Sequence, residues 1–430
     1  MPSVPSVPVL CLDIGSTWTK GALVSPDGDL LGTAQHATTT PEVLDGIAGV
    51  TSALAATGAE VLACSSAGGG LRLAVVGQER LVSAEAGYRV ALSAGAKVVH
   101  VSAGPLGSLT PLRADRPDVV LLVGGTDGGD DSVLLHNARR LAENRITVPI
   151  VLAGNADARD RAMALLDGRT VVATDNVLPD VGELSPGPAR AAIRDVFLRH
   201  VIGGKGLSRG TRFRSMVRTV TPDAVLAGVS RLAHLLAADD DPGAVLVVDV
   251  GGATTDVYSA VSTVDDQTST VALPADRRTV EGDIGMRWSA PGIVAEAKAE
   301  QLPHDNLAAG ADRRARDVDF IPSTPEESEV DTRLAAIAAI LAVRRHLRLV
   351  DNRLGPRGAG LLVLSGGVFR HATGQALHTI EQTLRDDPVL RPVLRAARIT
   401  VDRDYVLAPA GLLTGAGHDA TRLLRRLSPR

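Results

Sequence analysis

The sequence predicts an α/β protein built from two similar halves, with a further α/β unit inserted between them. Short apolar runs alternate with Ala- and Leu-rich stretches of helical period, which is the pattern of α/β proteins. An apolar strand followed by DIGSTWTK at 13–20 recurs in kind as DVGGATTD at 249–256. The chain has 430 residues. This exceeds the size at which a single hydrophobic core keeps growing, so two or more subdomains are expected.

Hydrophobic periodicity places the individual elements. The predicted strands are 8–12, 21–25, 60–64, 97–101, 119–123, 149–153, 170–174, 245–250, 256–261, 361–364 and 398–401. The predicted helices are 42–56, 82–94, 131–144, 157–167, 187–200, 222–238, 290–299, 329–347, 374–385 and 409–426.

The order of these elements predicts four segments. Between 105 and 180, the apolar runs VVLLV, PIVLA and TVVAT alternate with two helical stretches, which is typical of a self-contained parallel unit. We therefore expect a first half, an inserted α/β subdomain, a helical connection with the remainder of the first half, and a second half. Their expected ranges are 1–104, 105–180, 181–244 and 245–430.

Charge and composition argue against nucleic acid and membrane partners. The formal net charge is -4 and aromatic residues make up 2% of the chain, so there is no net basic field and little for base stacking. The N-terminal stretch lacks a basic n-region, and no run approaches the ~18 apolar residues of a membrane span. We expect a cytoplasmic protein. Its two cysteines, Cys11 and Cys64, lie in apolar runs and are expected to be packing residues.

The two similar motifs predict a pair of phosphate-binding hairpins. In each, a strand delivers an aspartate, Asp13 or Asp249, and a glycine then permits a tight turn. A carboxylate beside a phosphate would be repelled, so both aspartates are expected to hold Mg²⁺ through water, since Mg²⁺ prefers one or two carboxylates plus phosphate oxygens. Lys20 supplies a compact positive charge for the β- and γ-phosphates.

Three further motifs are weak alone but occur in a suggestive order. The strand LLVLS ends in Ser365-Gly366-Gly367 before a helix, where a nucleoside could lie close to the backbone. The others are EGDIGM at 281–286 and PAGLLTGAG at 409–417. Together with the two hairpins they form an ordered set of five.

That ordered set resembles the actin, Hsp70 and sugar-kinase superfamily, whose members have two phosphate motifs, two connecting segments and an adenosine motif around a cleft between duplicated domains. The resemblance implies duplicated actin-like ATPase (ribonuclease H-like) domains, with ATP and Mg²⁺ in the cleft. It implies catalytic and metal-holding roles for Asp13 and Asp249. The implied nucleotide-binding residues are Gly15, Ser16, Thr17, Lys20, Gly251, Gly252, Thr254, Gly282, Asp283, Gly366 and Gly367.

A narrower resemblance covers nearly the whole chain. The segments CSSAGGGLRLAVVG, LLVGGTDGGDDSVLLHNARRLA, VLAGN, DVGGATTDVYS, VEGDIGMRWS and LSGGVF are similar to the glutamate (methylaspartate) mutase accessory protein family, sometimes called MutL and unrelated to DNA mismatch repair. GGTDGGDD is the most diagnostic, because the superfamily fold has no need of it. The resemblance implies an ATP-dependent, chaperone-like reactivating factor for an adenosylcobalamin-dependent mutase, with slow ATP turnover.

Other functions of the same superfamily remain open at this point. A small-molecule kinase would need a carboxylate base, and Asp127, Asp130 or Asp131 in GGTDGGDD are candidates. The same loop could instead cap the following helix, or contact a client or ligand. An iron-sulfur activator of radical dehydratases is disfavoured by the two separated cysteines. A filament-forming actin-like protein is the non-enzymatic alternative.

Overall fold

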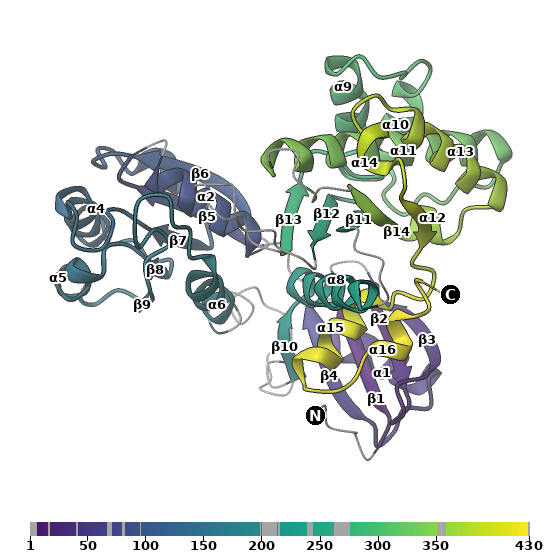
Figure 1. Ribbon diagram of the computed structural model, residues 1–430, viewed down its shortest axis with the longest axis horizontal. Coiled ribbons are helices and arrows are strands. Elements are labelled where there is room, and N and C mark those ends of the chain that lie inside the picture. Colours follow the sequence, from purple (N-terminus) through teal and green to yellow (C-terminus); the bar gives the residue numbers. More distant parts are fainter. Residues whose placement is uncertain are drawn as a thin grey trace.

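The structure, a computed structural model, contains three five-stranded sheets (Figure 1). It describes residues 7–15, 18–39, 42–66, 71–79, 82–94, 96–197, 199, 213, 216–238, 244–261, 276–350, 354 and 358–428. Two sheets are mixed and share one strand order, and the remaining sheet is wholly parallel. The predicted α/β class, with two halves built alike and an inserted α/β unit, is confirmed.

The first half is built on the sheet of order β10-β4-β1-β2-β3. β1 is antiparallel to β2 and parallel to β4. Helix α1 (Val43–Ala53) covers one face, and its apolar residues Val43, Ile47 and Val50 recur at helical spacing and are buried in the same core as Leu10. The strands are β1 (Val9–Ile14), β2 (Trp18–Val24), β3 (Leu30–Ala37), β4 (Glu60–Ser65) and β10 (Val217–Val220).

The second half repeats this sheet in the order β15-β14-β11-β12-β13, with the same strand directions. The long helix α11 (Pro325–Leu349) packs against it and begins at Thr324, whose hydroxyl accepts from the Glu327 amide. The strands are β11 (Ala244–Val250), β12 (Thr255–Ala260), β13 (Asp276–Glu281), β14 (Ala359–Ser365) and β15 (Arg398–Val401). The other helices are α9 (Ala290–Ala299), α10 (Ala308–Arg316), α12 (Gly367–Arg370), α13 (Gly374–Asp386) and α14 (Arg391–Leu394).

The parallel sheet has the order β6-β5-β7-β8-β9 and lies to one side of the two halves (Figure 1). Its strands are β5 (Arg72–Gly77), β6 (Lys97–Ala103), β7 (Val119–Leu122), β8 (Ile150–Leu152) and β9 (Val171–Ala173). Its helices are α2 (Ser83–Ser93), α3 (Thr110–Ala114), α4 (Ser132–Glu143), η1 (Ala156–Ala158), α5 (Arg159–Leu165) and α6 (Pro186–Val196).

The position of β5 and β6 differs from the predicted insert of 105–180. Residues 72–103 were expected to belong to the first half, 1–104, with a strand at 97–101 and none at 72–77. Both strands hydrogen-bond into the parallel sheet instead, where β5 lies between β6 and β7. The parallel unit therefore starts near Arg72 on strand pairing. Sequence order misplaces this boundary because the sheet that a strand joins is decided by pairing with residues distant in the chain.

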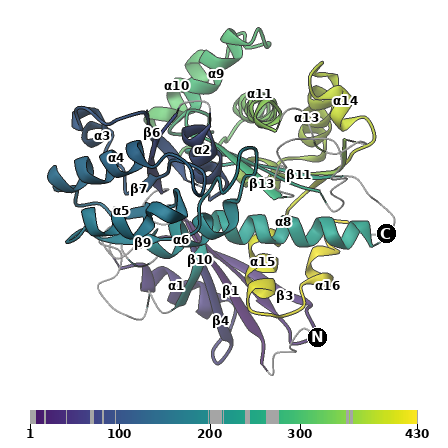
Figure 2. The same cartoon turned by 60° about the vertical axis from the view of Figure 1, so that its left-hand side comes forward.

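Two helices lie between the mixed sheets. Helix α8 (Thr221–Ala237) follows β10, helix α15 (Leu407–Gly415) follows β15, and the short α16 (Thr421–Leu424) lies beside them (Figure 2). Their apolar residues share one core with the strands of both halves, for example Val9 of β1 and Val247 of β11. The predicted segment 181–244 accordingly contains α6, β10, which completes the first sheet, and α8.

Glycines allow α8 and α15 to touch backbone to backbone. A methyl group added at Gly411 would lie 1.8 Å from the Ala224 carbonyl oxygen, and one added at Gly228 would lie 2.1 Å from that of Leu407. The two helix axes therefore approach more closely than any side chain at these positions would allow. Within the described ranges, no helix is long and apolar enough to cross a membrane.

We expect Gly411→Ala to destabilise the protein by about 1–3 kcal/mol despite the better helix propensity of alanine, because the added methyl group collides with backbone rather than with a movable side chain. Urea unfolding would measure the loss. Gly415→Ala is the matched control in the same helix, since a Cβ there meets nothing within 4 Å. Equal stability of the two variants would contradict the close contact of α8 and α15.

Candidate functional site

The two predicted hairpins have the same local geometry. The Gly15 amide donates to the Trp18 carbonyl at 3.0 Å, and the Gly251 amide donates to the Thr254 carbonyl at 2.9 Å. A Cβ at either glycine would lie 2.9 Å from that carbonyl oxygen, so the tight turn requires glycine. Ser16 and Thr17, predicted to contact phosphate, lie outside the described residues.

Equivalent positions in the two hairpins carry different charges. Asp13 pairs in register with Lys20 across the first hairpin, whereas Asp249 pairs with Asp256 across the second. Asp256 is in turn bound by Arg278 at 2.6 Å. The duplicated scaffold therefore presents one lysine, supplied by the first half only.

Lys20 of the first half interacts electrostatically with residues of both halves. Burial alone would lower the pKa of the Lys20 ammonium, but Tyr405, Asp13 and Asp249 together raise it above its ordinary value. Burial raises the pKa of Asp249, which Lys20 opposes and Asp256 reinforces. Residues from β1, β2 and β11, predicted separately from two distant motifs, thus interact with one another.

An aspartate also lies beside the start of each helix between the sheets. The Thr221 hydroxyl, at the first residue of α8, donates to Asp13 at 2.6 Å. Ahead of α15, Asp402 accepts from the amides of Val406 at 2.9 Å and Leu407 at 3.3 Å. Burial raises the pKa of Asp402 to about 6, against these amide bonds and with a contribution from Asp249.

Asp402 and Thr221 were missed by the sequence analysis. A signal existed, because each residue directly follows the fifth strand of its half. Only the duplicated topology makes these positions equivalent, and that topology depends on strand order, which the motifs alone do not give.

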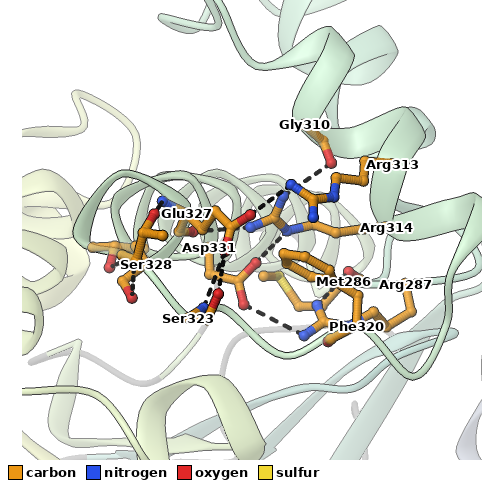
Figure 3. Close-up of polar contacts among 12 residues, drawn as sticks. Met286, Arg287, Gly310, Arg313, Arg314, Phe320, Ser323, Glu327, Ser328 and Asp331 are labelled. Carbon is orange, nitrogen blue, oxygen red and sulfur yellow. Dashed lines mark hydrogen bonds and ion pairs between the residues drawn. The ribbon is translucent and has the colours of Figure 1, made fainter.

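The segment after β13 holds the second hairpin in place. The amides of Met286 and Arg287 donate to the carbonyls of Gly251 at 2.9 Å and Gly252 at 2.7 Å. Figure 3 shows the Arg287 side chain directed toward Asp331 of α11, which also binds the buried Arg314. The hairpin backbone is therefore anchored to the core of the second half.

The structure places the predicted nucleotide contacts Gly282 and Asp283 within this supporting segment. Both Asp283 carboxylate oxygens accept from Arg345, at 2.8 and 2.9 Å, and Arg345 also binds Glu281 at 2.7 Å. The Gly282 carbonyl accepts from the Ser289 hydroxyl at 3.2 Å. In this arrangement Asp283 is engaged by α11.

Gly366 and Gly367 differ in their surroundings. Gly366 has φ of 117°, and a Cβ there would lie 2.3 Å from the Val250 carbonyl oxygen. Glycine is therefore required at position 366 because the backbone of β11 lies so close. A substitution there would disturb the sheet and would not test nucleoside binding. Gly367 is exposed, and a Cβ there would meet nothing within 4 Å.

The GGTDGGDD loop is fixed from within. Asp130 accepts from the Ser132 amide at 2.9 Å, at the start of α4, which supports the capping interpretation. Asp127 accepts from the Ala156 amide at 2.8 Å and the Asn176 side chain at 2.9 Å. These two carboxylates are engaged in holding the loop, which weakens the case for a kinase base here.

A cavity of about 500 Å³ lies beside β15, away from the hairpin turns. It contains Asp402 but none of the predicted phosphate contacts. Its lining includes Leu377, His378, Glu381, Thr400, Asp402 and Arg426. The candidate site therefore rests on the hairpins rather than on this cavity.

Similarity to known proteins assigns the family. A family model described as MutL protein matches residues 9–427. The chain belongs to the MutL protein family. Protein MutL of Clostridium tetanomorphum is 32% identical over 458 aligned positions, covering 97% of this chain and 98% of that protein.

Solved structures align with this MutL family member at low identity. Nucleotide-free acetone carboxylase is 14% identical, with a TM-score of 0.42, over 87% of this chain and 67% of its own. A ROK family glucokinase from Streptomyces griseus in complex with glucose and AMPPNP is 14% identical, with a TM-score of 0.35, over 97% of this chain and 99% of its own. Both TM-scores lie below 0.5, and no functional conclusion is taken from either.

The residues around the hairpins suit a magnesium-bound triphosphate. Asp13 and Asp249 are two partly buried carboxylates, which is the number that Mg²⁺ commonly takes from protein. Among the described side chains, no three or more His, Cys, Asp or Glu residues group as metal ligands. Lys20 adds the cation that a triphosphate would require, and the turn at Gly252 and Ala253 is exposed.

We expect Asp331→Asn to destabilise the MutL family member by about 3–5 kcal/mol, because it leaves Arg314, which is 1% exposed, without its buried counter-charge. It should also loosen the second hairpin, since Arg287 loses the same partner. Thermal unfolding and hydrogen exchange at 249–254 would measure the two effects. Glu329→Gln, at an exposed position of the same helix, is the control and should change neither.

Proposed function

We propose that this MutL family member binds Mg-ATP between its two hairpins and hydrolyses it slowly. The observation that carries the proposal is the position of Lys20 of the first half, whose Nζ atom lies 3.8 Å from the ring centroid of Tyr405 in the second half and whose pKa is raised by Asp13 and Asp249. A ligand that needs a lysine from one half and a carboxylate from the other is bound only when both halves face it. Such a site links occupancy to the relative position of the halves.

The proposal assigns tasks to part of the predicted set of residues. Asp13 and Asp249 hold the metal through water, and Lys20 balances charge on the β- and γ-phosphates. Gly251, Gly252 and Thr254 line the phosphates from the second half, with Gly367 toward the nucleoside. Bound Mg²⁺ would supply charge neutralisation at the phosphates.

Slow turnover follows from the hydrogen bonds of the two aspartates. Asp13 accepts from Thr221, and Asp249 interacts with the Ser365 hydroxyl, so both are engaged in structure. Neither is placed as a free base for water. We expect turnover well below the ~10 s⁻¹ typical of metabolic enzymes.

We further propose that the protein uses this cycle to reactivate an adenosylcobalamin-dependent mutase of the glutamate mutase type. A radical mutase that has lost its adenosyl group retains a dead cobalamin, and a protein that pulls it open would allow exchange. No covalent chemistry on the client is needed, only two conformations with different affinity for it. Family membership is the support for this step.

The parallel α/β unit is the proposed client-facing part. It lies to one side of the two halves, and the hairpins belong to neither its strands nor its helices (Figure 1). It also exposes the apolar side chains of Val101 and Met163, with Val181 exposed just beyond it. These side chains lie on separate elements, so the support for this assignment is that the unit carries none of the nucleotide motifs.

A small-molecule kinase is the alternative, and one observation bears against it. Asp127 and Asp130, two of the three candidate bases, are held by loop and helix amides within the parallel unit. Phosphoryl transfer from ATP to an added sugar would favour the kinase over the reactivating factor.

We expect Lys20→Met to weaken ATP binding by roughly 10- to 150-fold, the equivalent of a charge-assisted contact of about 1.5–3 kcal/mol. Asp249→Asn should reduce Mg²⁺-dependent hydrolysis more than it reduces folding. Titration calorimetry with ATP and Mg²⁺ would measure affinity, with Lys298→Met, an exposed lysine on α9, as the control. Normal ATP affinity in Lys20→Met would refute the placement of the first hairpin.

We expect the protein to restore activity to its mutase in a reaction that needs ATP, Mg²⁺ and free adenosylcobalamin. The assay loads the mutase that co-purifies from the native host with a tight non-adenosyl cobalamin, and follows cobalamin release and recovered activity. Equal recovery with and without ATP would refute the mechanism and leave the fold and family unchanged.

A further inference from the structure

The ring of Tyr405 contacts cations from both halves. The Lys20 Nζ atom of β2 lies 3.8 Å from the ring centroid, and the Arg370 guanidinium carbon of α12 lies 4.5 Å from it. Both distances are within the ≈ 6 Å of a cation–π interaction. Arg370 ends the short helix α12 that begins at Gly367, so one ring joins the expected phosphate lysine to the segment after the expected nucleoside glycines.

Tyr405 is also fixed to the start of α15. It lies in the short connection from β15 to that helix, with a left-handed φ of 52°, an uncommon conformation for an aromatic residue. On one side, Arg403 donates to the Arg370 carbonyl at 2.9 Å. On the other, the amides of Val406 and Leu407 bind Asp402. A displacement of the ring would therefore shift the first turn of α15.

We propose that Tyr405 is a positioning residue that holds Lys20 in the nucleotide-free protein. When Lys20 moves from the ring to a bound phosphate, the ring is released and the first turn of α15 shifts. The proposal rests on the proposed function for the identity of the phosphate ligand. The ring contact and its link to α15 stand independently of that ligand. Because α15 touches α8 backbone to backbone, a shift of its first turn acts on the packing that joins the two halves.

A ring that competes with phosphate for one ammonium opposes nucleotide binding. Removing the ring should tighten ATP binding by about 2- to 30-fold, which converts from a cation–π contact of about 0.5–2 kcal/mol at 1.4 kcal/mol per tenfold. Tyr405→Phe keeps the ring but loses the hydroxyl that also acts on Lys20, so it should tighten ATP binding less than removal of the ring does. This direction is opposite to that of a residue which contacts ATP itself, whose loss would weaken binding.

The first experiment needs no nucleotide. Cysteines introduced by Asp27→Cys and Gln375→Cys, at exposed positions of the two halves, carry spin labels, while the native Cys11 and Cys64 are buried. Wild type and Tyr405→Phe should give the same distance distribution, and Tyr405→Leu a broader one. Phe320→Leu is the matched control, because Phe320 also faces two arginines, Arg313 and Arg314, but within one half (Figure 3). An unchanged distribution in Tyr405→Leu would overturn the proposal.

The second experiment measures ATP affinity of the same variants by calorimetry. Tighter binding in Tyr405→Leu than in Tyr405→Phe supports the proposal, and unchanged or weaker binding in Tyr405→Leu overturns it. If Tyr405→Leu fails to fold, Tyr405→Asn replaces it in both experiments, because asparagine tolerates the left-handed backbone. If the wild type binds no ATP, the proposed function fails, and the nucleotide-free distances alone decide the role of Tyr405.

Discussion

The close approach of α8 and α15 is the constraint on which the rest of the structure depends. Gly228 and Gly411 let the two backbones touch, so both helices fit between the two mixed sheets and share one core with them. Each helix also begins where the fifth strand of its half ends. The packing that joins the halves therefore also fixes where the hairpin aspartates lie relative to the helix starts. Any relative motion of the halves changes the contact between α8 and α15.

The two halves share the same scaffold but differ in the charges that they place at their hairpins. The sheet order, the strand directions and the glycine turn are the same in both halves, but Lys20 and Asp256 occupy equivalent positions with opposite charge, and Cys64 and Ser365 pair in register with Asp13 and Asp249. One half thus offers a cation, and the other an acid already bound by arginine. Two identical hairpins would place like charges opposite one another, whereas these two are complementary.

The sequence predicts the local parts of this arrangement and misses the long-range ones. A glycine turn after an apolar strand is a local signal, so Asp13 and Asp249 could be assigned to equivalent hairpins from spacing alone. Asp283 binds Arg345, which is 62 residues away in the chain, and Tyr405 contacts Lys20 of the other half. No local sequence pattern encodes either contact. The same reason explains β6, which was placed in the first half, and β5, which was not predicted as a strand.

Charge at the candidate site affects the start of α15 through two carboxylates, Asp249 and Asp402. Burial raises the pKa values of Asp249 and Asp402. Asp249 further raises the pKa of Asp402, whereas Lys20 lowers that of Asp249. Asp402 simultaneously caps the first amides of α15. A change of positive charge beside Asp249 therefore alters how favourably Asp402 ionises, and an ionised carboxylate is the stronger acceptor for helix amides. Charge between the hairpins thus acts on the start of α15 through Asp249 and Asp402.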